Sequence, residues 1–163
     1  MIARAIPKTG RRRCRLLYVE DHADSVMLVK RLLEGRKDLL LLHAADAKLA
    51  IELARTQRPE AILINADLAG MSALEFMKVL RADPATEATP ILALGGNAAP
   101  QAIVKALEAG FFQVLAKPLQ AGPFMDALAF ALEFAAVERS EDNPLLLRRH
   151  WHKGSRDGQI QSL

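Results

Sequence analysis

Between residues 16 and 138, short apolar runs alternate with longer segments of helical period, and this alternation constrains the fold more than any other feature. The short runs are nearly continuous in apolar character, as a strand that is covered on both faces of a sheet requires. The alternation predicts a parallel sheet with crossover helices. The predicted strands are Leu16–Glu20, Leu39–Ala44, Ala61–Asn65, Ile91–Leu94 and Gln113–Ala116.

Between and after these strands, apolar residues recur three or four positions apart, which is the spacing of an amphipathic helix. We expect each of these stripes to face the sheet. Because crossover connections are right-handed, the natural assembly is a doubly wound α/β sandwich with five parallel strands. The stripes are Val26, Val29 and Leu33; Leu49 and Leu53; Leu74, Met77 and Leu80; Ile103 and Leu107; and Leu128 and Leu132.

The 163 residues are enough for one domain with a conventional hydrophobic core. Cys14 is the only cysteine, so the chain cannot form an internal disulfide. No apolar stretch is long enough to cross a bilayer or to form the core of a secretory signal. These features predict a soluble cytoplasmic protein without a membrane partner.

The net charge of +3 is distributed unevenly along the chain. Residues 1–15 carry basic side chains and no acid, whereas acids outnumber bases between residues 16 and 138. We therefore expect a basic flexible arm over residues 1–13, an acidic domain over residues 14–138, and a basic extension over residues 139–163. A basic arm either binds polyanions or keeps a protein soluble, and we favour solubility, so nucleic acid is not an expected partner.

Ligands of a parallel α/β sheet gather at the carboxyl ends of its strands, so the residues at those ends are the candidates for chemistry. Glu20 and Asp21 stand at the end of the first predicted strand, Asn65 ends the third, and Lys117 follows the fifth. Adjacent carboxylates with a lysine indicate a site for a divalent cation and an anionic group. A solvated strand end that pairs with a nearby lysine is the alternative that this pattern leaves open.

Four segments resemble the receiver domains of two-component response regulators, in the order and spacing of that family. The resemblance implies a CheY-like, flavodoxin-like fold with strand order 2-1-3-4-5 and a role in phosphorelay signalling. The segments are LYVEDHADS (residues 17–25), PEAILINADLAGM (59–71), TPILAL (89–94) and AGFFQVLAKPL (109–119).

In that family an acid pair holds Mg²⁺, and a lysine followed by a proline, with a cis peptide between them, completes the pocket. Glu20, Asp21, Lys117 and Pro118 match these positions. The family also has an aspartate that accepts the phosphoryl group at the end of the third strand, where this chain has Asn65.

The family's two switch positions also differ. A threonine or serine that contacts the phosphate is replaced by Gly95, and an aromatic residue that rotates inward is replaced by Val114. Because the acceptor and both switch residues are lost together, natural divergence explains the chain better than a single engineered change of aspartate to asparagine.

An amide oxygen is neutral and delocalised toward nitrogen, so Asn65 cannot attack phosphorus to form an acyl phosphate. Asn65 also removes one negative charge from the cluster, so Mg²⁺ is expected to bind weakly at best, through Glu20, Asp21 and the Asp67 backbone carbonyl. Asp67 is an alternative phosphoacceptor. We disfavour it because two residues of extended chain place it about 6 to 7 Å further along the strand direction, away from Lys117.

The C-terminal extension is predicted to contain a short helix that begins near Asn143. Leu147 and Trp151 lie four residues apart on one face, which suits docking on the domain itself, pairing with a second copy, or insertion into a partner's groove. Arg148, Arg149 and Trp151 are also groups that bind nucleotides, and the tail is loosely similar to receiver-like proteins that bind cyclic di-GMP. We favour docking or dimer packing.

The predicted function is that of a stand-alone, non-enzymatic pseudo-receiver, which requires neither phosphorylation nor a cofactor and acts through protein–protein contact. The expected partners are a histidine kinase, another response regulator, or a second copy. Any of these partners, a second copy included, would bind the face formed by the helix of Ile103 and Leu107, the strand Gln113–Ala116 and the helix of Leu128 and Leu132. Two alternatives remain: a cyclic di-GMP sensor that uses the tail, and a phosphoacceptor that uses Asp67 or another carboxylate.

Overall fold

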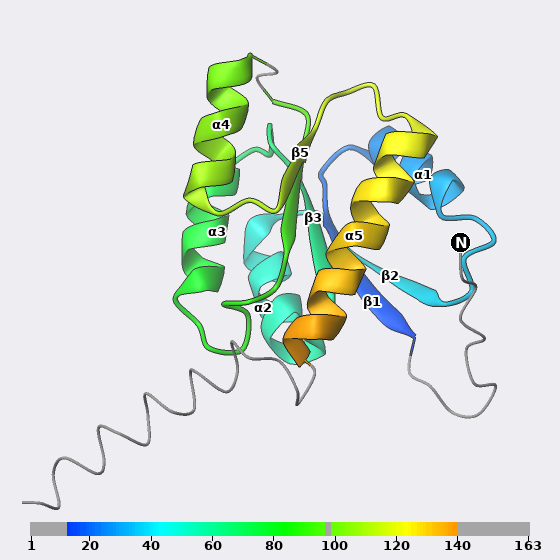
Figure 1. Cartoon of the computed structure of the whole chain (residues 1–163), viewed down its shortest axis with the longest axis horizontal. Helices are drawn as coiled ribbons and strands as arrows, with labels where there is room; N and C mark the ends of the chain where they lie inside the picture. Colours follow the sequence, from blue (N-terminus) through cyan, green and yellow to red (C-terminus); the bar gives the residue numbers. More distant parts are fainter. Residues whose placement is uncertain (1–12, 97–98, 140–163) are drawn as a thin grey trace, which may run out of the picture.

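The computed structural model describes residues 13–96 and 99–139, which form a parallel sheet with helices on both faces (Figure 1). The order of the strands is β2-β1-β3-β4-β5, as predicted. Three predicted strand ranges are confirmed, whereas the first strand starts two residues earlier and ends before Glu20, and the last ends at Leu115. The strands are β1 (Cys14–Val19), β2 (Leu39–Ala44), β3 (Ala61–Asn65), β4 (Ile91–Leu94) and β5 (Gln113–Leu115).

Five helices connect and follow these strands within the described residues: α1 (Ala23–Leu32), α2 (Ala47–Gln57), α3 (Ala73–Arg81), α4 (Pro100–Ala109) and α5 (Ala121–Arg139). Helices α1 and α5 bury their apolar residues on one face of the sheet, and α2 and α3 on the other. The sheet is therefore the middle of three layers, with a hydrophobic core on each side of it.

Several of the predicted core positions are confirmed. The buried residues include Val26 and Val29 of α1, Leu33 just after it, Met77 and Leu80 of α3, and Leu128 of α5.

Three predicted core leucines are instead exposed. Leu49 is 41% exposed, because α2 approaches the sheet through the small side chains of Ala47, Ala50 and Ala54, a stripe displaced from the one the leucines suggest. Leu74 and Leu107 are also exposed. Leu107 lies on α4, which packs beside the short edge strand β5 and has no buried residue. The leucine spacing therefore predicted the wrong core residues on α2, where alanines contact the sheet, and on α4, where no residue is buried.

The register of the sheet decides which strand ends meet. Val19 of β1 pairs with Ile64 of β3, and Asn65 of β3 pairs with Leu94 of β4, which itself pairs with Leu115 of β5. The residues after these positions therefore emerge side by side at one edge of the sheet. No helix among residues 13–96 and 99–139 is long and apolar enough to span a membrane.

Candidate functional site

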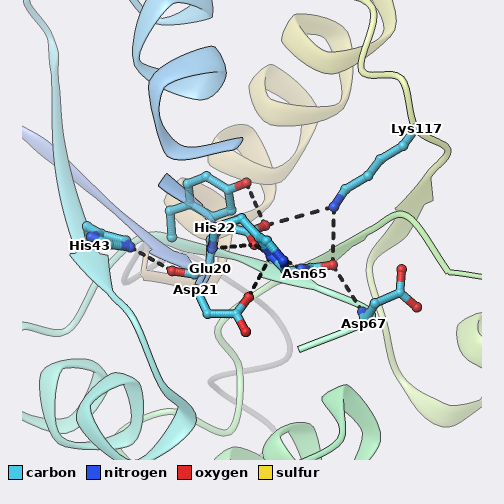
Figure 2. Close-up of polar contacts among 8 residues, drawn as sticks. Glu20, Asp21, His22, His43, Asn65, Asp67 and Lys117 are labelled. Atoms are coloured by element: carbon cyan, nitrogen blue, oxygen red, sulfur yellow. Dashed lines mark hydrogen bonds and ion pairs between the residues drawn. The ribbon is translucent and has the colours of Figure 1, made fainter. Parts of the chain in front are cut away.

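The predicted site residues meet at the carboxyl edge of the sheet (Figure 2). Glu20 and Asp21 follow β1, Asn65 ends β3, and Lys117 lies in the loop after β5. The structure thus brings together four residues that the sequence places in three separate segments. The peptide between Lys117 and Pro118 is cis, as the resemblance implied.

Glu20 is the centre of this cluster, and its side chain is fully buried. Its Oε1 accepts hydrogen bonds from Asn65 Nδ2 at 2.9 Å and from the His22 backbone amide at 3.1 Å. Its Oε2 accepts one from the Tyr18 hydroxyl at 3.1 Å and lies 3.9 Å from Lys117 Nζ. A buried carboxylate is stable only when hydrogen bonds and opposite charges replace its lost hydration, and these donors supply that replacement.

The partners of Asn65 determine the orientation of its amide. The Lys117 ammonium and the Asp67 backbone amide are donors only, and they lie 3.3 and 3.0 Å from Asn65 Oδ1. The Glu20 carboxylate is an acceptor, and it lies against Nδ2. Because each end of the amide meets only the complementary kind of group, a flipped side chain would place donors against donors and an acceptor against an acceptor.

Three residues of the site were not identified from the sequence: Tyr18, His22 and His43. Tyr18 lies two residues before Glu20, on the same face of an extended chain, and this period of two is the signal that was available. Burial, the charge of Glu20 and the hydrogen bond to it raise the pKa of the Tyr18 phenol, which therefore remains protonated. His43 Nε2 donates to the Glu20 backbone carbonyl at 2.8 Å.

His22 lies over both carboxylates of the acid pair. Its Nδ1 is 3.1 Å from Glu20 Oε1 and 2.9 Å from Asp21 Oδ1. The hydrogen bond to Glu20 and the nearby charge of Asp21 raise the pKa of His22. Glu20, Asp21 and His22 each offer one potential metal-ligating atom, and these atoms lie within 4.8 Å of one another.

Gly95 allows Lys117 to enter the site. Gly95 has a positive φ of 82°, and a Cβ built on it would lie 3.1 Å from Lys117 Cδ and 3.2 Å from Cε. The space that a side chain at position 95 would need is therefore taken by the stem of the lysine. Val114, the other degenerate switch position, is half-buried and packs against the α2 and α3 side of the core.

Asp67 contributes its backbone amide to the site, through the hydrogen bond to Asn65, and its side chain is exposed. The candidates for nucleotide or partner contact, Arg148, Arg149 and Trp151, lie outside the described residues. So do the predicted helix near Asn143 and residues 1–12 of the basic arm.

Comparison with known proteins identifies the domain. The family model described as the response regulator receiver domain matches residues 16–129. The chain is 31% identical over 122 residues to the sensory/regulatory protein RpfC of Xanthomonas campestris, which is 72% of this chain and 16% of that protein. It is 34% identical over 147 residues to the sensor histidine kinase AruS of Pseudomonas aeruginosa, which is 83% of this chain and 14% of that protein.

The fold is similar to those of solved receiver structures. The chemotaxis response regulator CheY4 of Vibrio cholerae has a TM-score of 0.68 and 24% identity, with 74% of this chain and all of that chain covered. The receiver domain of the sensor histidine kinase PA1611 from Pseudomonas aeruginosa, solved with a magnesium ion in its active-site cleft, has a TM-score of 0.67 and 25% identity. It covers 75% of this chain and 99% of that chain.

The curated relatives are much longer than the matched region, since the chain spans only 14 to 16% of RpfC and AruS. By its family match, fold and sheet-edge residues, the chain belongs to the response regulator receiver domain family of two-component signalling.

Proposed function

We propose that this receiver domain signals without being phosphorylated and without catalysing a reaction, by presenting one fixed surface to another signalling protein. The observation that carries the proposal is Asn65 at the end of β3, with its amide held between Glu20 and Lys117. A carboxamide has no anionic oxygen to attack phosphorus. Lys117, which neutralises phosphoryl oxygens in the family, donates here to the amide oxygen at 3.3 Å.

The surroundings of Lys117 support the same proposal. No hydroxyl is available at Gly95 to contact a phosphoryl group, and the lysine stem fills the space that such a side chain would need. Val114 has no ring that would rotate in response. The site therefore lacks both groups that transmit phosphorylation to the surface in the family.

The surface that we propose for partner binding lies on α4, β5 and α5. Phe130 is 63% exposed, and its ring centroid lies 5.6 Å from that of Phe112, which leads into β5. Phe134 packs on the same ring at 5.3 Å, and Val104 of α4 is also exposed. Exposed aromatic residues of this kind supply much of the binding energy at protein interfaces. The candidate partners are a histidine kinase, another response regulator and a second copy of this chain.

Intact-mass analysis after incubation with acetyl phosphate and MgCl₂ tests whether phosphorylation is absent. The wild-type chain is expected to gain no phosphoryl mass, whereas Asn65→Asp, which restores a carboxylate beside Glu20 and Lys117, is expected to gain one. A phosphoryl adduct on the wild type would contradict the proposal. Loss of that adduct in Asp67→Asn would identify Asp67 as the acceptor instead.

The proposed surface has its own test. Sedimentation equilibrium of the full chain measures self-association, and cross-linking to a purified histidine kinase measures the other mode of contact. Phe130→Ser is expected to weaken whichever contact occurs, and Leu49→Ser, which alters an exposed leucine on α2, serves as the control. Equal binding by the two variants would show that the partner binds elsewhere.

A further inference from the structure

Receiver domains of this family hold a divalent cation on their acid pair, and the contacts of the acid pair in this chain decide whether such an ion fits. Mg²⁺ requires oxygen ligands in near-octahedral geometry and gives up its own water reluctantly. The fit therefore depends on which oxygen atoms still have a free lone pair directed toward the site.

Both oxygens of Glu20 already accept hydrogen bonds from the protein, and Oε1 accepts more of them than Oε2. Oε1 receives hydrogen bonds from Asn65 Nδ2 and the His22 backbone amide, and Oε2 receives one from the Tyr18 hydroxyl. The side chain is fully buried, and Lys117 Nζ lies 3.9 Å from Oε2, so a cation on Oε2 would lie close to the positive charge of the lysine. A cation on Oε1 would face the partial positive charge of the Asn65 amide hydrogens at close range.

The Asn65 amide cannot offer its oxygen to an ion without further cost. Asn65 Oδ1 already accepts from Lys117 Nζ at 3.3 Å and from the Asp67 backbone amide at 3.0 Å. Turning Oδ1 toward the acid pair would break both hydrogen bonds and would direct the amide hydrogens at two other donors. The orientation that satisfies Lys117 and Asp67 is the one that places Nδ2 on Glu20.

The space between the two carboxylates is also occupied. His22 Nδ1 lies 3.1 Å from Glu20 Oε1 and 2.9 Å from Asp21 Oδ1, so the imidazole bridges the acid pair as a shared cation would. The Asp21 carboxylate is partly exposed, and the backbone amides of Asp21 and Ala69 also donate hydrogen bonds to it.

We infer that the Asn65 amide and the His22 ring take the place of the divalent cation. The amide links the end of β3 to Glu20 after β1, and the ring, although exposed, bridges Glu20 and Asp21 in the absence of metal. The amide joins Glu20 to Lys117, which are the two groups that an ion and a phosphoryl group would otherwise bridge. The receiver site is thus closed by its own side chains and gains nothing from Mg²⁺.

Thermal unfolding in MgCl₂, compared with NaCl at equal ionic strength, tests this inference. The midpoint of the wild-type chain is expected to be the same in both salts. Asn65→Asp is expected to unfold several degrees lower in NaCl, because two carboxylates then face each other, and to recover in MgCl₂ as the ion binds. Gln101→Glu, which adds the same charge on an exposed position of α4, is expected to respond to neither salt.

A wild-type midpoint that rises in MgCl₂ and loses that rise in Asp21→Asn would overturn the inference, because it would place the ion on the acid pair. If Asn65→Asp does not fold in NaCl, it can be purified in MgCl₂ and then treated with chelator, and unfolding on chelation is the expected result. An Asn65→Asp chain that is as stable as the wild type in NaCl would equally refute the inference. These outcomes are separate from those of the phosphorylation test, which measures mass and not stability.

Discussion

Replacing Gly95 with alanine is expected to destabilise the domain more than the same replacement at Gly35. The two glycines have nearly the same φ, 82° and 86°, so the strain of placing a Cβ at a positive φ is common to both. That strain costs about 1–2 kcal/mol. A Cβ at Gly35 would meet no atom within 4 Å, so strain is its only cost.

The additional cost at Gly95 comes from Lys117. The new Cβ would lie 3.1 to 3.4 Å from three carbons of the lysine stem, which must then move by a few tenths of an ångström. The hydrogen bond from Nζ to Asn65 is already 3.3 Å long, and we expect this movement to break it. Loss of such a bond costs about 0.5–1.5 kcal/mol. Gly95→Ala should therefore lower the free energy of unfolding by about 1 kcal/mol more than Gly35→Ala.

Urea unfolding followed by far-ultraviolet circular dichroism measures both free energies. Lys117→Ala removes the stem, so in that background the two alanine variants are expected to cost the same. If Gly95→Ala and Gly35→Ala are equal in the wild-type background, or if their difference persists without the lysine stem, then Lys117 is not the reason for glycine at position 95.

Two further predictions concern other parts of the domain. Thr86 is buried, and its hydroxyl donates to the Leu80 carbonyl at 2.6 Å. Thr86→Val should therefore lower the free energy of unfolding in urea by about 1 kcal/mol. The control Thr56→Val, on an exposed helix face, should lower it by almost nothing. The hydrogen bond to Glu20 raises the pKa of His22 in the folded chain. The contribution of the His22 charge to stability is therefore complete below the unfolded pKa of about 6.5, and it is lost as the pH rises through the higher folded pKa. An NMR titration should show the raised pKa, and His22→Gln should remove this part of the pH dependence; a titration at or below the unfolded value would contradict the assignment.

Much of the fold could be predicted from the sequence because the strands of a buried parallel sheet are apolar on both faces. Ile62, Leu63 and Ile64 form one continuous apolar run, and a solvent-exposed strand would interrupt such a run with polar residues. Helix faces were harder to predict, because leucine spacing does not reveal that alanines make the closest approach. For this reason Leu49 was assigned to the core, whereas Ala50 beside it is fully buried.

The residues of the candidate site were also predictable as types, since Glu20, Asp21, Asn65 and Lys117 stand at strand ends where their chemistry can be recognised. The spacing of two residues between Tyr18 and Glu20 was the only signal for Tyr18. His22 was missed because nothing in a linear sequence distinguishes a histidine that bonds a buried carboxylate from one that does not.

The sequence by itself determined the order of strands and helices and the absence of a carboxylate at position 65. Only the tertiary structure decided what the amide at that position does. Asn65 carries a donor and an acceptor, and which of them faces the acid pair depends on Glu20, Lys117 and the Asp67 backbone amide. Glu20 and Lys117 come from β-strand ends that are far apart in the chain, so the direction of the amide follows from their meeting in space and not from any local pattern.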